Sequence, residues 1–312
     1  MARERPIPFT VIGGFLGAGK TTLLNRILAQ SDGVRYVVLI NDFASLNIDA
    51  ALIRDHDGRT LTLTNGCICC SIGDRLIEAL VELLSQPDPG DHILVEVSGV
   101  GDPRRIADIA VIDRDLRLDS VLVLADAAEI RRQVDDRFVG DIVRRQLGAA
   151  DILIVNKIDL VQPQVLMALG GWLAEAAPGA IQLSACRGEL PVAALLGQWQ
   201  GSWRGQAKSS PEHHDARFRH ETLQWDNLLE RETFLAAIAA LPATVIRGKG
   251  FVRFTDRPEA PELFQMVGRR WELVSTSRWA TLTDNCRLVF IGTPEMPDLQ
   301  PHFPIVRRPG LD

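Results

Sequence analysis

Residues 14–21 follow the phosphate-loop pattern, in which a glycine is followed by four residues and then by Gly-Lys-Thr. Glycines let backbone N–H groups close around phosphate oxygens, while Lys20 can reach the terminal phosphates and the Thr21 hydroxyl can hold Mg²⁺. A strand-like run at 8–12 precedes the loop, and an amphipathic helix pattern follows it from Lys20 to about Gln30. This context favours a nucleoside triphosphate site over a merely flexible glycine turn. The residues expected to contact the nucleotide here are Gly14, Gly17, Ala18, Gly19, Lys20, Thr21 and Thr22.

A second motif, Asn-Lys-Ile-Asp at 156–159, indicates which base the nucleotide carries. The Asp159 carboxylate can accept hydrogen bonds from the ring N–H and the amine of guanine, whereas adenine would leave this buried charge unpaired. The stem of Lys157 can lie over the base, and Asn156 can tie this loop to the phosphate loop. Ser184 and Ala185 fit a backbone contact to the guanine carbonyl oxygen. A solvated helix start is the plainer interpretation, but the place of the motif at a strand end favours GTP.

Between these two motifs, Glu-Val-Ser-Gly at 96–99 ends another strand-like run. The carboxylate of Glu96 can hold Mg²⁺ through water or position the attacking water, and the Gly99 backbone N–H can approach the γ-phosphate. The alternative is a strand-end glutamate that merely faces solvent, and its position makes the functional interpretation the better one.

Three of the five cysteines, Cys67, Cys69 and Cys70, lie within four residues and follow Gly66. Thiolates are ligands that Zn²⁺ and Cu(I) favour, and the glycine can supply the turn that brings the sulfurs together. Buried apolar cysteines and a redox pair of Cys67 with Cys70 are the alternatives, and such dense clustering favours a metal site. Two further cysteines at 186 and 286 lie far apart in the sequence, and we expect both in the core.

Strand-like and helical patterns alternate over the first two thirds of the chain. The strands are expected at 9–12, 36–40, 93–97, 120–125, 152–155 and 180–183, with helices such as 72–84, 141–147 and 165–176 between them. Continuous apolar strands separated by helices predict an α/β fold with a mostly parallel sheet covered on both faces. A shorter pair of strands at 52–56 and 60–63, joined by Asp-Gly, predicts a hairpin inserted after the second strand.

The composition changes near residue 199, where a polar stretch broken by glycine and proline has no usable periodicity. We therefore expect a nucleotide-binding domain at 1–198, a linker at 199–216 and a smaller α+β domain at 217–312. In the last of these, strands are expected at 218–225, 243–254, 263–267 and 287–291, with one helix at 230–241.

Composition excludes several classes of protein. With 312 residues, 46% hydrophobic and 24% charged, the chain has the composition of an ordinary globular protein. A net charge of −6 argues against a nucleic-acid partner, and apolar runs are too short for a membrane-spanning helix. An odd number of cysteines does not suit a secreted disulfide framework, and residues 1–5 include Glu4, unlike a cleaved signal. We therefore expect a cytoplasmic protein with no membrane partner.

Several motifs occur in one order: Gly-Gly-Phe-Leu-Gly-Ala-Gly-Lys-Thr-Thr-Leu-Leu-Asn, Asn-Gly-Cys-Ile-Cys-Cys, Glu-Val-Ser-Gly-Val-Gly-Asp-Pro and Asn-Lys-Ile-Asp. Together they strongly resemble the CobW-type metallochaperone GTPases, relatives of HypB and UreG. The resemblance is close over the first ~190 residues. It continues loosely at 245–250, Val-Ile-Arg-Gly-Lys-Gly, which looks like the Arg-x-Lys-Gly signature of the family's C-terminal domain. It implies a P-loop GTPase domain, a CobW-type C-terminal domain and GTP-dependent delivery of a metal, most often Zn²⁺, to a client protein.

The resemblance also implies roles for individual residues. Cys67, Cys69 and Cys70 match the family's metal ligands, and Cys70, Ser71 and Asp74 match residues that lie close to the nucleotide there.

Two stretches depart from the family pattern. Where relatives show Asn-Glu-Phe-Gly-Glu, this chain has Asn-Asp-Phe-Ala-Ser at 41–45, so the first carboxylate is shortened to Asp42 and the second is missing. Many relatives also carry a histidine-rich linker, whereas His213, His214 and His220 are the histidines found here, and whether they bind metal stays open.

The leading hypothesis is a slow GTPase switch with Lys20, Glu96 and Asp42 in catalytic roles. Thr21, Glu96 and a switch carboxylate, Asp42 or Asp49, would hold Mg²⁺, while Lys20 neutralises developing charge. We find no clear water-orienting glutamine or arginine finger, which predicts slow turnover. Because the cysteine motif leads into the helix near residue 72, contacts of the γ-phosphate can reshape the metal site and release the metal on hydrolysis.

Alternatives remain for the metal and the class of protein. The same enzyme can insert cobalt or iron for a corrinoid or nitrile-hydratase-type client. A GTP-regulated module with redox-sensing or structural cysteines is a different class, and the guanine motif disfavours a small-molecule kinase. We expect a client metalloprotein to dock on the C-terminal domain, and a nucleotide- or metal-dependent dimer is a further expectation.

Overall fold

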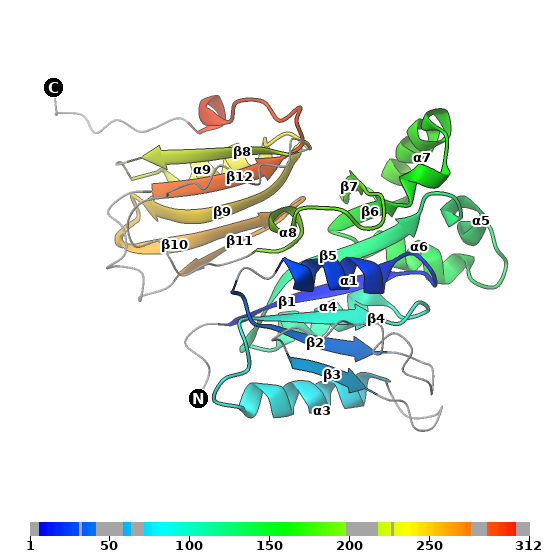
Figure 1. The fold of residues 1–312 in the computed structure, drawn as a ribbon. Coiled ribbons are helices and arrows are strands. Elements are labelled where there is room, and N and C mark those ends of the chain that lie inside the picture. The colour runs from blue at the N-terminus through cyan, green and yellow to red at the C-terminus, as the bar shows by residue number, and fades with distance from the viewer. Residues whose placement is uncertain are drawn as a thin grey trace. The chain divides into compact units, whose positions relative to one another are not determined.

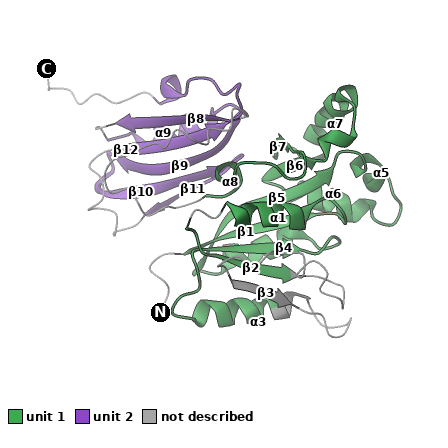
Figure 2. Cartoon of the chain, in the orientation of Figure 1, with its two compact units in different colours: residues 1–202 green, residues 203–312 purple. Residues whose placement is uncertain are grey.

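The computed structural model of the chain describes residues 6–30, 33–41, 59–63, 72–197, 218–225, 228–275 and 286–303, with backbone alone for 41, 59–63 and 72–75. Two compact units, residues 1–202 and 203–312, make up the chain (Figure 2). The finer division into domains at 1–198 and 217–312 with a linker at 199–216 stays a prediction. Among the described residues, no helix is long and apolar enough to cross a membrane.

The first unit is built on a seven-stranded parallel sheet in the order β3–β2–β4–β1–β5–β6–β7 (Figure 1). Its strands are β1 (Ile7–Gly14), β2 (Tyr36–Asn41), β3 (Arg59–Leu63), β4 (His92–Val97), β5 (Leu116–Asp126), β6 (Ile152–Asn156) and β7 (Ile181–Ser184). Every residue of β4 and β6 is buried, as expected for parallel strands covered on both faces. The predicted α/β fold with a parallel sheet is confirmed.

Helices connect these strands and bury their apolar residues against the sheet. They are α1 (Lys20–Ala29), α3 (Ile72–Ser85), α4 (Pro103–Ile112), α5 (Ile130–Val134), α6 (Gly140–Gly148), α7 (Pro163–Ala176) and α8 (Val192–Leu195). One apolar core joins residues of α3, α4, α6 and α7 to alternate residues of the strands, among them Phe9, Val11, Val95 and Leu153. The helix α1 lies on β1 and β4, where Leu23, Leu24 and Ile27 are buried.

The strand predicted at 60–63 is present as β3, but it belongs to the main sheet. It pairs in parallel with β2, from Val37 opposite Arg59 to Asn41 opposite Leu63, and forms the edge of the sheet. Its expected hairpin partner at 52–56 lies outside the described residues.

The second unit holds a five-stranded antiparallel sheet in the order β11–β10–β9–β12–β8. The strands are β8 (Arg219–Trp225), β9 (Val245–Phe254), β10 (Arg257–Val267), β11 (Arg270–Ser275) and β12 (Cys286–Gly292), and the helix α9 spans Arg231–Ala239. Phe234 of α9 packs its ring edge against Phe254 and Phe264 of the sheet, with centroid distances of 5.4 Å in both cases. The predicted smaller α+β domain is thereby confirmed as a fold.

The edge strand β11 was not predicted from the sequence. It pairs with β10 through a two-residue loop that begins at Gly268, whose φ of 58° is accessible to glycine without strain. The alternation of β11 is weak because the strand lies half-exposed at the edge, so the periodicity carries little signal.

Candidate functional site

The phosphate loop lies where the sequence places it, between the end of β1 and the start of α1. Glycine is required at 14 and 19, whose φ angles are 132° and 105°. A Cβ at Gly19 would lie 2.4 Å from Asn156 Nδ2, and one at Gly14 would lie 2.5 Å from Leu124 O. Because the N-cap residue of α1 is Gly19, no side chain caps the first N–H groups of the helix. Such a helix start can bind an anion.

A cavity of about 370 Å³ adjoins this loop, a volume within the range of roughly 300–1,000 Å³ typical of small-molecule sites. It is lined by Leu16, Gly17, Gly19, Lys20, Thr21, Thr22, Ile40, Glu96, Val97, Ser98 and Gly99. The loop of β1, the start of α1 and the carboxyl end of β4 therefore meet here, as predicted for ligand sites of open parallel sheets.

The side-chain oxygens of two residues, Thr21 and Glu96, lie next to each other on the wall of the cavity. The Thr21 hydroxyl donates to Glu96 Oε1 at 3.0 Å, and the Glu96 side chain is 3% exposed. Hydroxyl and carboxylate oxygens are ligands that Mg²⁺ prefers, so this donor set fits the ion. The structure brings together the two described residues that the sequence assigned to Mg²⁺.

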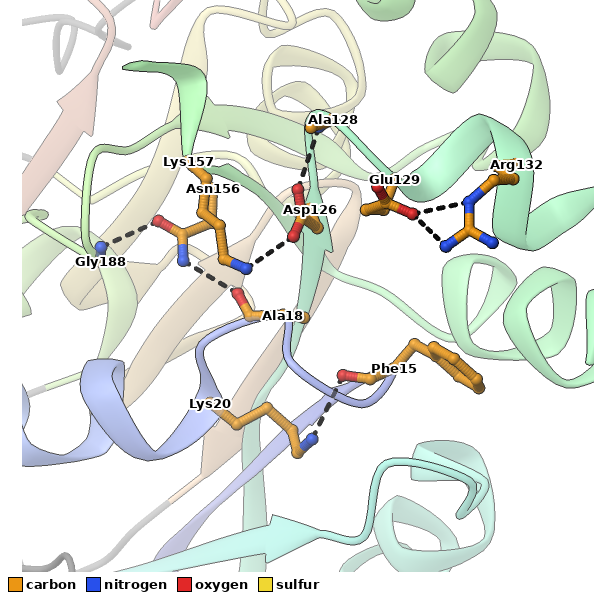
Figure 3. A network of polar contacts seen from close by, with 10 residues as sticks. All are labelled: Phe15, Ala18, Lys20, Asp126, Ala128, Glu129, Arg132, Asn156, Lys157 and Gly188. Atoms are coloured by element: carbon orange, nitrogen blue, oxygen red, sulfur yellow. Dashed lines mark hydrogen bonds and ion pairs between the residues drawn. The ribbon is translucent and has the colours of Figure 1, made fainter. Parts of the chain in front are cut away.

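The Lys20 ammonium rests on the phosphate loop itself. It donates to Gly14 O at 3.1 Å and to Phe15 O at 3.4 Å, and Figure 3 shows the latter contact. The side chain is 8% exposed, which keeps the charge close to the backbone of the loop. A lysine held in this place can exchange the carbonyl oxygens for phosphate oxygens.

Asn156, the first residue of the Asn-Lys-Ile-Asp motif, links the loop after β6 to the phosphate loop (Figure 3). Its amide Nδ2 donates to Ala18 O at 2.9 Å, and its Oδ1 accepts from the Gly188 N–H at 2.9 Å. The residue is 1% exposed and ends β6, so a rigid strand fixes the link. This is the role that the sequence predicted for Asn156.

Lys157 adopts a left-handed backbone with φ of 60°. Its ammonium pairs with Asp126 Oδ2 at 2.6 Å, as Figure 3 shows. Asp126, which is 6% exposed, ends β5 and was missed in the sequence. The signal available was its position, since β5 is flanked by β1 and β6 and all three strands end at the edge that carries the motifs.

Asp159 follows in a 3₁₀ turn, Ile158–Leu160. Its Oδ1 accepts a hydrogen bond from the Cys186 thiol at 3.1 Å. This hydrogen bond, with a smaller contribution from burial, raises the pKa of the Cys186 thiol above its ordinary value. The expectation that Cys186 lies in the core is wrong, because the residue follows β7 beside the 158–160 turn and is only half-buried, whereas Cys286 is buried as predicted.

Ser184 and Ala185 lie at the end of the edge strand β7, beside this turn. The Ala185 N–H donates to Val155 O at 2.8 Å, and Ala185 O accepts from the Ile158 N–H at 3.3 Å. Both backbone groups of this buried residue therefore serve the fold. The predicted backbone contact of Ser184 and Ala185 with the guanine carbonyl oxygen stays a prediction.

Several expected site residues lie outside the described residues, namely Asp42, Asp49, Cys67, Cys69, Cys70, Ser71, His213 and His214. The backbone of Asp74 lies in α3, and His220 is an exposed residue of β8. Within the described ranges, no group of three or more His, Cys, Asp or Glu residues is arranged to hold a metal ion. The cysteine metal site therefore stays a prediction.

A second residue that the sequence did not single out contacts the turn after Glu96. Gln146 of α6 donates through Nε2 to Gly99 O at 3.1 Å and to Gly101 O at 2.8 Å. Only the fold brings it there, since nothing in its sequence context distinguishes it from other polar residues on a helix.

Comparison with known proteins agrees with the site. Residues 8–182 match the CobW/HypB/UreG nucleotide-binding domain, and residues 218–301 match the cobalamin synthesis protein cobW C-terminal domain.

Similar curated proteins span the chain to different extents. A protein of Sinorhizobium sp named zinc chaperone CobW is 31% identical over 95% of both chains. One of Escherichia coli named zinc chaperone YjiA is 39% identical over 50% of both chains. A Schizosaccharomyces pombe protein named zinc-regulated GTPase metalloprotein activator 1 is 36% identical over 52% of this chain and 41% of its own. The chain therefore belongs to the CobW/HypB/UreG family and also carries a domain of the cobW C-terminal type.

Proposed function

We propose that the chain is a GTP-hydrolysing metallochaperone that binds Zn²⁺ and passes it to a client protein. The observation that carries the nucleotide part is the meeting of three motifs at one edge of the sheet, where Asn156 joins the base loop to the phosphate loop. The metal part is supported by the names of relatives, of which one that aligns along nearly the whole chain is called a zinc chaperone.

The residues of the cavity divide the work of hydrolysis. Lys20 moves from the loop carbonyls to the terminal phosphates and neutralises the charge that develops there. The Gly99 N–H donates to the γ-phosphate, and Glu96 positions the attacking water. Thr21 and Glu96 would hold Mg²⁺, which supplies further neutralisation of the phosphates when bound. Slow turnover is expected, because the sequence offers no clear water-orienting glutamine or arginine finger.

Zn²⁺ is the cargo in this proposal. Cys67, Cys69 and Cys70 bind it as thiolates, and the motif lies directly before α3, so a change in the nucleotide site reaches it along the chain. The second unit provides the docking surface for the client in this proposal. Under this proposal the protein works in the reducing environment of the cytoplasm, where thiolates stay available for metal.

The decisive experiment is a zinc-competition titration carried out with a non-hydrolysable GTP analogue and with GDP. Replacement of Cys67, Cys69 and Cys70 by alanine should abolish tight Zn²⁺ binding while GTP binding persists. The Cys286→Ala variant is the matched control, since this buried cysteine lies in the second unit and should leave Zn²⁺ affinity unchanged. An unchanged Zn²⁺ affinity in the triple variant would contradict the proposed metal site. Tighter binding of Co²⁺ than of Zn²⁺ would indicate that cobalt is the metal delivered.

Nucleotide choice has its own test. Hydrolysis should proceed with GTP and not with ATP, since the Asp159 carboxylate finds its donors on guanine alone. Equal competition by ATP for binding would contradict the GTPase assignment and favour a kinase.

A further inference from the structure

Gln146 is a fully buried amide that has no place in the proposed mechanism. It lies on the inner face of α6 and is 1% exposed. One side-chain nitrogen, Nε2, reaches two backbone carbonyls, those of Gly99 at 3.1 Å and Gly101 at 2.8 Å. The amide thus bridges the two ends of a short segment that starts directly after the carboxyl end of β4.

That segment is a tight turn on the wall of the nucleotide cavity. The Gly101 N–H donates to Ser98 O at 2.9 Å and closes the turn, and Ser98 and Gly99 line the cavity. A Cβ at Gly99 would lie 2.9 Å from the Leu16 backbone nitrogen, so the turn is pressed against the phosphate loop. Its conformation therefore decides where the Gly99 N–H points.

Three hydrogen bonds together fix this turn. A trans peptide is planar, so the contacts of Gln146 with the carbonyls of Gly99 and Gly101 orient the 99–100 and 101–102 peptide planes. The bond from the Gly101 N–H to Ser98 O orients the 98–99 plane, which carries the Gly99 N–H. The contact with Gly99 O is buried and the one with Gly101 O is partly buried, and loss of the donor would leave these carbonyl groups without their side-chain partner at a cost in free energy.

The other polar atom of the Gln146 side chain, Oε1, also indicates that the amide is needed as a donor. This oxygen is buried and has no hydrogen-bond partner among the described residues. An apolar side chain of equal size would fill this place without an unpaired acceptor, so packing does not account for a glutamine here. The donor function of the amide is what the turn uses.

We propose that Gln146 is a positioning residue that holds the 98–101 turn in the conformation in which Gly99 meets the γ-phosphate. The inference rests on the proposed GTPase function and deepens it. Gln146 acts through the turn and does not touch the nucleotide. Since GDP lacks the γ-phosphate, its affinity should not depend on Gln146, whereas affinity for the triphosphate and its hydrolysis should.

The test compares Gln146→Met with Gln182→Met in the full chain. Methionine matches glutamine in size but cannot donate. The control loses a contact of the same kind, since Gln182 Nε2 donates to Gly170 O at 3.1 Å away from the cavity. For Gln146→Met we expect about tenfold weaker binding of a non-hydrolysable GTP analogue and about tenfold lower kcat, with GDP affinity within about twofold of wild type. The control should keep all three values.

A second variant separates positioning from packing. In Gln146→Glu the carboxyl keeps the volume and, while protonated, one donor; burial raises its pKa, so it loses this donor as the pH rises. The hydrolysis rate of this variant relative to wild type should therefore fall with rising pH. If the melting temperature of this variant instead fell over the same pH range and the GTP-analogue and GDP affinities fell together, the ionised carboxyl would merely disturb the packing, and the positioning role would be overturned.

The outcomes are distinguishable. A lower melting temperature of Gln146→Met with an unchanged ratio of GTP-analogue to GDP affinity would overturn the positioning role and leave the GTPase function standing. Loss of both affinities to the same extent would overturn it as well. A wild-type chain that neither binds nor hydrolyses GTP would instead defeat the proposed function, and this inference with it.

Discussion

The two sides of the nucleotide site differ in how far their polar groups are already engaged. On the base side, Asn156 makes hydrogen bonds to the phosphate loop and to Gly188, and Lys157 is paired with Asp126. On the phosphate side, the buried Ser98 hydroxyl has no partner in the described part of the chain. The Lys20 ammonium there rests on loop carbonyls at 3.1 and 3.4 Å.

This difference suggests a division of labour. Groups that are held in place before the ligand arrives lose little freedom on binding, so a preorganised base side contributes affinity for any guanine nucleotide. A group such as the Lys20 ammonium must exchange its loop carbonyls for phosphate oxygens, so its contribution to affinity depends on whether a γ-phosphate is present. Under the proposed function, discrimination between the triphosphate and the diphosphate is therefore expected on the phosphate side, where Gln146 contacts the 98–101 turn.

The largest effect is expected on the phosphate side, from Lys20→Ala. Removal of the only described cation that lines the cavity should lower kcat for GTP hydrolysis by about 10²–10³-fold, as for other groups that stabilise transition-state charge. Single-turnover hydrolysis with saturating GTP measures the effect. Arg26→Ala, which removes an exposed ion pair from the same helix, serves as the control and should keep the wild-type rate. A rate for Lys20→Ala within tenfold of wild type would contradict the assignment.

On the base side, Asp159→Asn should change the choice of base. The amide repels the guanine amine and cannot accept from both guanine donors, so GTP affinity should fall on the order of 100-fold. Xanthine carries a carbonyl in place of the amine, and the new amide can donate to it. Equilibrium titration with GTP and xanthosine triphosphate should therefore show a reversal of preference. An unchanged GTP affinity would mean that the base lies elsewhere.

A smaller effect is expected where the two sides are joined. Asn156→Ala removes the links to Ala18 and Gly188, and the affinities for GTP analogue and GDP should fall together by about tenfold. Parallel titrations with both nucleotides measure this. A selective loss of the triphosphate, as expected for Gln146→Met, would show that the division between the two sides is wrong.

The sequence was sufficient for the parts of the site that local patterns encode. Local backbone geometry requires the glycines with positive φ, and the lysine at the helix start and the carboxylate at the strand end are recognised by their places in short motifs. These residues lie where they were expected. The parallel sheet followed from apolar strands that carry no alternation. Such features depend on residues close together in the chain, which periodicity and spacing capture.

Long-range partners were beyond such reasoning. Asp126 and Gln146 act on residues 31 and 45–47 positions away, and their roles follow from strand order and helix packing. The edge strand β11 was missed for a related reason, since pairing at a sheet edge leaves a weak pattern, and the pairing of β3 with β2 likewise did not follow from its sequence. Cys186 was misjudged because the preference of cysteine for burial says nothing about a carboxylate brought alongside by the fold.

The smallest predicted effect concerns this thiol and probes the base side directly. The hydrogen bond and the negative charge of Asp159 raise the pKa of the Cys186 thiol, so less of the reactive thiolate is present at pH 8. Removing that charge with Asp159→Asn should lower the pKa and speed alkylation of Cys186 by iodoacetamide by roughly two- to fivefold. Peptide mass spectrometry of the nucleotide-free protein gives the rate at each cysteine.

Cys286 is the internal control for this measurement. Burial raises the pKa of its thiol, and it lies in the second unit, so its slow alkylation should be the same in wild type and variant. An unchanged or slower rate at Cys186 would mean that Asp159 does not hold this thiol in solution. Asp159 would then not be held in place before the nucleotide binds. Only Asn156 and Lys157 would remain as preorganised groups on the base side, and the difference from the phosphate side would be smaller.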